Sequence, residues 1–176
     1  MVNSAAVKQY DDYLFDVVHQ ALTFAYRYSG QQYSPSVLAQ FMARSGGSGK
    51  GLSGLDGAAQ AGLIRAMIDR LPMQERHIIA ARFSANECES VGARLALLPV
   101  AICCMGTGCH STRAADALLQ KWFGLKLNIH DVADMYGIQR NAVSPAWRNV
   151  RESMKQIWER AEEGAFRELQ RSGLIP

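Results

Sequence analysis

The chain has 176 residues, enough for one domain or two small ones, and its apolar content is that of a globular protein with a core. The net charge is only +3, but fourteen of the nineteen basic residues are Arg, which suits bidentate contacts to phosphates and base edges. The N-terminus has no signal-peptide pattern, and the longest apolar run, Leu95 to Met105, is interrupted by Pro99 and too short to span a bilayer. We therefore expect a cytoplasmic protein with no membrane partner.

The first part of the chain is predicted to be a helical segment, 1–44, followed by a linker. Apolar residues recur at three- and four-residue steps between Tyr10 and Tyr28, which predicts a helix over about 5–28. Ser34-Pro35 fits the N-cap and first position of a short helix that ends near Arg44. Ser45–Gly57 contains six Gly and three Ser, so it is predicted to be a flexible linker.

The remaining residues, 58–176, are predicted to form one helical domain. The first helices expected in it lie at about Ala58–Arg70, Pro72–Phe83, Ser84–Leu98 and Ser111–Phe123. Ser84 and Glu87 have the spacing of a capping box, and Pro99–His110 is expected to be irregular. Because no stretch alternates as a strand does, the predicted fold class is all-α.

The most informative segment is Asn128–Arg151, which fits a helix-turn-helix. The two helices of this motif cross steeply, so a small residue must lie where they touch and a Gly must take the turn. Ala133 and Gly137 meet these demands, and Asn128 is expected to cap the first helix. The residues expected to fill the space between the helices are Val132, Tyr136, Ile138 and Val143. The alternative is a helical hairpin that binds no nucleic acid.

In a helix-turn-helix, the second helix enters the major groove with its N-terminal residues against base edges. The predicted DNA-binding residues are Gln139, Arg140, Asn141, Ser144, Arg148 and Arg151. Arg usually reads guanine and Asn or Gln adenine, whereas Arg148 and Arg151 suit phosphates. Pro145 does not fit a helix interior, so either the helix kinks there or the long helix begins at Ser144-Pro145.

Beyond Pro145 the pattern predicts a long C-terminal amphipathic helix. Its apolar positions step by three and four at Trp147, Val150, Met154, Ile157 and Ala161, and more loosely at Ala165 and Leu169. Such a stripe either packs on the core of its own chain or forms the seam of a homodimer.

Two segments resemble region 4 of bacterial sigma factors. Leu71–Phe83 is similar to its opening helix, with a Leu-Pro, a polar-acidic-Arg step, an aliphatic pair and an Arg-aromatic end, and Ile129–Arg151 resembles its helix-turn-helix. The resemblance implies that Leu71–Phe83 packs against the helix-turn-helix, with about 84–127 as an inserted, Cys-bearing segment. The chain departs from a true sigma region 4 in that insertion, and it has no recognisable region 2.

This organisation resembles a phage late-gene antiterminator of the Q type. The resemblance implies binding near a late promoter in a bacterial host cell and engagement of a paused RNA polymerase. The expected function is therefore a sequence-specific transcription regulator that binds double-stranded DNA and RNA polymerase. The alternatives are a dimeric phage or prophage repressor or activator, a packaging protein of the small-terminase kind and, more distantly, an enzyme built on the cysteines.

The cysteines allow a structural zinc site. Cys104 and Cys109 bracket a turn of suitable length, and the candidate ligands are Cys88, Cys104, Cys109 and His110. No Cys-x-x-Cys occurs, and the other interpretation is that the cysteines are small buried hydrophobic residues. Since no third group that would orient a catalytic Cys-His pair is evident, no enzyme activity is expected.

Overall fold

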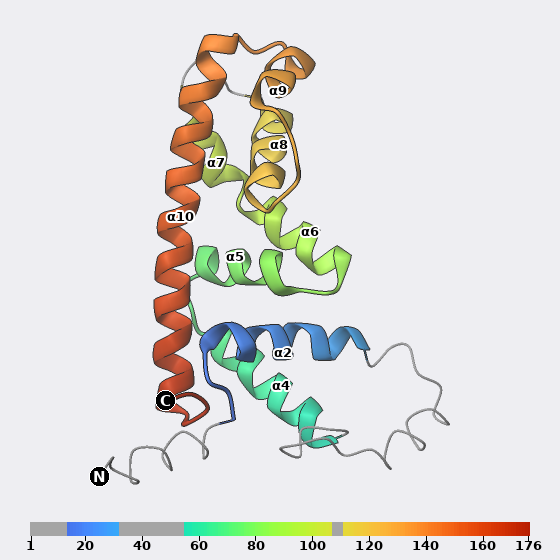
Figure 1. Cartoon of the computed structure of the whole chain (residues 1–176), viewed down its shortest axis with the longest axis vertical. Coiled ribbons are helices and arrows are strands. Elements are labelled where there is room, and N and C mark those ends of the chain that lie inside the picture. The colour runs from blue at the N-terminus through green and yellow to red at the C-terminus, as the bar shows by residue number, and fades with distance from the viewer. Residues whose placement is uncertain (1–13, 32–54, 107–110) are drawn as a thin grey trace, which may run out of the picture. The chain divides into compact units, whose positions relative to one another are not determined.

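The computed structural model describes residues 14–31, 55–106 and 111–176 (Figure 1). Every regular element in these ranges is a helix, which confirms the all-α prediction. The helices are α2 (Val18–Gln31), α4 (Leu55–Ile68), α5 (Met73–Phe83), α6 (Glu87–Ala96), α7 (Leu98–Met105), α8 (Thr112–Trp122), α9 (Ile129–Tyr136) and α10 (Arg140–Arg171). The short helix predicted to end near Arg44 lies outside the described residues.

The chain divides into two compact units. Unit 1 takes the described parts of Met1–Pro72 together with Phe83–Asn86 and Glu162–Pro176, and unit 2 takes Met73–Arg82 and Glu87–Ala161. The long helix α10 contributes residues to both. The predicted division at 1–44, 45–57 and 58–176 depends on residues outside the described ranges and stays a prediction.

Unit 1 is built on the packing of α2 against α4. Its largest fully buried side chains are Leu22, Ile64, Ile68, Leu169 and Ile175, so segments far apart in the sequence supply its core. The backbone N–H of Phe15 donates to the carbonyl of Leu174 at 3.1 Å, which ties the residues before α2 to the C-terminus.

Two helix boundaries in unit 1 differ from prediction. The described residues before Val18 are not helical, so the first helix does not extend back to about residue 5 as expected. Phe15 in this stretch is instead hydrogen-bonded to Leu174, a contact that no local sequence pattern reveals. The helix α4 begins at Leu55, inside the predicted linker, with Asp56 in the first turn, where an acidic side chain favours the helix dipole.

Two predictions for the segment after α5 are wrong. The helix α6 begins at Glu87, later than the expected capping box would start it, and the hydroxyl of Ser84 accepts a hydrogen bond from the N–H of Asn86 at 3.1 Å. Pro99–Met105, part of the stretch expected to be irregular, belongs to the helix α7. Pro99 lies in its first turn, where a backbone N–H would have no partner within the helix, so proline is tolerated there.

The helix α8 is the central element of unit 2. Of the two residues that could open it, Ser111 and Thr112, Ser111 is the cap, with the hydroxyl accepting from the N–H of Ala114 at 3.3 Å. Its buried side chains are Ala114, Ala115, Ala117, Leu118 and Leu119, and it packs on α7, α9 and α6. Arg94 of α6 forms an ion pair with Asp116 of α8, which ties these two helices together.

The expected packing of Leu71–Phe83 against the helix-turn-helix segment is wrong. The helix that packs on α9 is α8, and in Figure 1 α5 and α9 lie beside different stretches of α10. The contacts of α5 go elsewhere: the carbonyl of Ala81 accepts from the hydroxyl of Ser90 at 2.9 Å, and Glu75 pairs with Arg160 at 3.8 Å. The segment 84–127 is therefore part of the core that supports α9, because it contains α8.

The helix α10 runs from Arg140 through Pro145 to Arg171 without a break, so the long helix does not begin at Ser144-Pro145. Its apolar stripe is buried within the chain, at Val150, Met154, Ile157, Ala161, Ala165 and Leu169. This confirms that the stripe packs on the core of its own chain.

Among the described residues, one stretch, Glu87–Met105, is long and apolar enough to cross a membrane by length and composition. It comprises α6 and α7, and only a minor part of it is buried. In this structure α7 packs on α8, and Arg94 of the same stretch is paired with Asp116.

Candidate nucleic-acid interface

The segment predicted as a helix-turn-helix forms a helical corner, residues 128–151, called the corner below. The side chain of Asn128 caps α9 by accepting from the N–H of His130 at 3.2 Å. Gly137 ends α9 in the left-handed conformation, with φ of +66°, and the N–H of Ile138 donates back to Ala133 at 2.9 Å. The carbonyl of Gln139 then accepts the first bonds of α10. The predicted roles of Asn128 and Gly137 are confirmed.

The interior of the corner is apolar and close to the expected set. Val132, Ala133 and Val143 are fully buried, so the two helices meet through one small and two branched side chains. Tyr136 and Ile138, also expected there, are only half-buried. Because α8 covers α9, the corner is held by the core of unit 2 and presents its other side to solvent.

The turn supplies a test of this local geometry. Replacing Gly137 with alanine should lower the free energy of unfolding by about 1–2 kcal/mol, because an L-residue is strained in the left-handed region. A new Cβ would meet no atom within 4 Å, so the cost comes from φ alone. The control is Gly62→Ala in α4, where the Cβ also meets nothing and φ is helical; it should stabilise by about 0.5–1 kcal/mol. Urea denaturation measures both, and two shifts of the same sign would contradict the assigned turn.

The structure places most of the predicted DNA-binding residues on the surface. Gln139, Arg140, Asn141, Arg148 and Arg151 are exposed, and Ser144 is half-buried. Asn141, Ser144, Arg148 and Arg151 follow one another at three- and four-residue steps, so they share one side of α10. Val143 and Val150, which are buried, lie on the opposite side of α10. One polar face of α10 is thus left open along the corner.

In the described part of the chain, Arg148 and Arg151 on this face form no ion pair, although the exposed Glu152 lies on the same side of α10. Some arginines of other helices are engaged, for example Arg94 with Asp116 and Arg82 over the ring of Trp158, whereas Arg113 of α8 is exposed like Arg148 and Arg151. Two guanidinium groups one helical turn apart are therefore free to bind an anion such as a phosphate.

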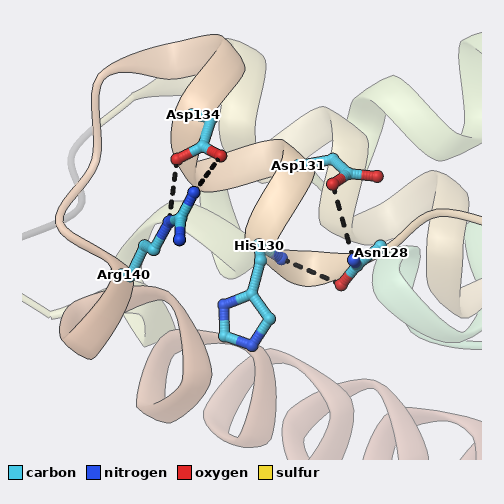
Figure 2. A network of polar contacts seen from close by, with 5 residues as sticks. All are labelled: Asn128, His130, Asp131, Asp134 and Arg140. Carbon is cyan, nitrogen blue, oxygen red and sulfur yellow. Dashed lines mark hydrogen bonds and ion pairs between the residues drawn. The ribbon is translucent and has the colours of Figure 1, made fainter.

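Arg140 differs from them because it is paired with an acid. Its Nε donates to one carboxylate oxygen of Asp134 at 3.0 Å and its Nη2 to the other at 2.6 Å (Figure 2). The hydrogen bond from Arg140 lowers the pKa of Asp134, and the same bond raises the pKa of Arg140. Sequence reasoning missed Asp134, since it lies six residues before Arg140 and faces it only because of the turn at Gly137.

The zinc prediction is not tested. Cys88 is exposed on α6 and Cys104 is half-buried on α7, while Cys109 and His110 lie outside the described residues. In the ranges that the structure describes, no group of three or more His, Cys, Asp or Glu side chains could hold a metal ion. The interpretation of the cysteines as buried hydrophobic residues is wrong for Cys88 and Cys103, because both are exposed.

No family model matches this sequence, and no curated protein is significantly similar to it.

Proposed function

We propose that the chain is a transcription regulator that binds double-stranded DNA in a sequence-specific manner through the corner. The observation that carries this proposal is the open polar face of α10, with two unpaired arginines, on a corner whose cap and turn match a helix-turn-helix.

The proposed docking follows from the position of these residues along α10. The start of α10, at Arg140 and Asn141, enters the major groove and reads base edges, as the second helix of a helix-turn-helix does. Arg148 and Arg151 lie further along the same helix and bind phosphates, which sets the orientation of the protein on the duplex.

The resemblance to sigma region 4 and to Q-type antiterminators extends the proposal to a second partner. We propose RNA polymerase of a bacterial host as that partner, and the cytoplasm as the place where the protein acts. Co-purification of the full chain with RNA polymerase, with and without promoter DNA, tests this extension separately from DNA binding.

The phosphate contacts are tested by the salt dependence of DNA binding. Arg148→Ala and Arg151→Ala should each reduce the slope of log affinity against log salt concentration by about one, because each removes one counterion-releasing contact. The measurement is fluorescence anisotropy of a labelled duplex over a salt series.

The matched control is Arg167→Ala. Arg167 is also exposed on α10 and carries the same charge, but it belongs to unit 1 and not to the corner. The slope for Arg167→Ala should equal that of the wild type. Equal slopes for all three variants and the wild type would contradict the proposed interface, and absence of any duplex binding would contradict the proposed function.

A further inference from the structure

The ion pair between Asp134 and Arg140 crosses the turn of the corner. Asp134 belongs to the last turn of α9, and Arg140 is the first residue of α10 (Figure 2). Both side chains stay open to solvent, at 54% and 67% exposed. The contact therefore does not hold a core together, and an acid beside a DNA-binding face would by itself repel phosphates. A role in core packing therefore does not explain why Asp134 lies beside Arg140.

The geometry of the pair leaves part of the guanidinium unused. A guanidinium carries five N–H donors in a fixed plane. Asp134 takes the side formed by Nε and Nη2, at 3.0 and 2.6 Å. The edge formed by Nη1 and the second hydrogen of Nη2 has no acceptor among the described residues. That edge is the one with two parallel donors pointing away from the side chain, the arrangement that matches O6 and N7 of guanine.

Resting on the proposed DNA-binding function, we infer that Asp134 is a positioning residue that fixes Arg140 to read a guanine in the major groove. A free arginine loses rotamer freedom when it binds a base, which weakens binding. The carboxylate of Asp134 holds the guanidinium plane before DNA arrives, so less freedom is lost. It also fixes which edge of the guanidinium faces the groove, and this favours guanine over adenine at that position.

The test begins with the full-length wild-type chain and duplexes selected from a random-sequence library. At the position that Arg140 reads, replacing guanine with adenine weakens binding by the wild type but leaves binding by Arg140→Ala unchanged. Asp134→Ala should lower the ratio of affinities for the guanine and adenine duplexes by about 3- to 10-fold. In the Arg140→Ala background the same change should leave the ratio unaltered. Asp134→Glu, which keeps the carboxylate, should retain part of the guanine preference that Asp134→Ala loses.

Asp131→Ala is the matched control. Asp131 is a second exposed acid on α9 whose charge also acts on Arg140, but it accepts a hydrogen bond from Asn128 and none from Arg140. Its removal changes the charge near DNA by the same amount, so it should shift affinity for both duplexes alike and leave their ratio unchanged. Thermal unfolding of each variant confirms that the fold is retained, and Asp134→Asn serves as a second variant of nearly the same shape.

The outcomes separate this inference from the function on which it rests. If Asp134→Ala shifts the affinity for both duplexes equally, as Asp131→Ala does, Asp134 acts only through its charge and the inference is overturned while DNA binding stands. A selected site with no guanine at the Arg140-dependent position overturns it in the same way. If the wild-type chain binds no duplex, the inference and the proposed function both fall.

Discussion

Replacing Ile79 with alanine is expected to lower the free energy of unfolding by about 2–5 kcal/mol. Ile79 is fully buried in α5, next to the equally buried Ile78. Truncation to alanine removes three carbon atoms from a packed interior and leaves a cavity that the neighbouring helices fill only in part, so both the lost burial and the cavity contribute. Denaturant unfolding followed by far-ultraviolet circular dichroism measures the change.

The control for Ile79 lies on the same helix. Met73 begins α5 and is 59% exposed, so Met73→Ala should change stability by less than about 0.5 kcal/mol. Both substitutions truncate an apolar side chain of α5 to alanine, and they differ strongly in burial. Equal effects of the two substitutions would mean that α5 does not bury Ile79 in the native protein.

The second large effect concerns sequence discrimination. Arg140→Ala and Asn141→Ala should each reduce the preference for the selected duplex over a scrambled one by about 5- to 150-fold, the value of a good bidentate base contact. Binding to the scrambled duplex should change much less, because phosphate contacts such as those of Arg148 and Arg151 remain. Competition binding with matched and scrambled duplexes gives both numbers.

Arg167→Ala and Gln156→Ala are the controls for this pair. Both residues are exposed on α10 but lie beyond the start of the helix, where no base contact is proposed. Neither substitution should alter the preference. Loss of affinity for both duplexes to the same degree in Arg140→Ala and Asn141→Ala would show that these side chains touch only phosphates, or no DNA at all.

The local features of the fold could be predicted from the sequence because they depend on a few neighbouring residues. Asn128 caps α9, Gly137 adopts positive φ and Ser111 caps α8, and each of these rests on the chemistry of one side chain within a few positions. The helix α7 follows a similar rule, because Pro99 lies in its first turn, but the sequence prediction of an irregular stretch from Pro99 does not use it.

The contacts between distant residues could not be predicted in this way. The resemblance to sigma region 4 paired α5 with the corner, whereas α8 packs on α9. Periodicity indicates which side of a helix is apolar but does not indicate which helix covers it. The same limit applies to the candidate site: the exposed face of α10 follows from the pattern, but the pairing of Asp134 with Arg140 depends on the angle of the turn.

The composition of unit 1 has a consequence for how the protein is made. Its core combines α2 and α4 with Leu169, Leu174 and Ile175, and the backbone of Phe15 is hydrogen-bonded to that of Leu174. On a ribosome, the N-terminal helices emerge long before these last partners do, so unit 1 completes its core only after synthesis has passed Ile175. A transcript cut short before that point yields chains with unburied apolar helices, which cellular proteases remove readily.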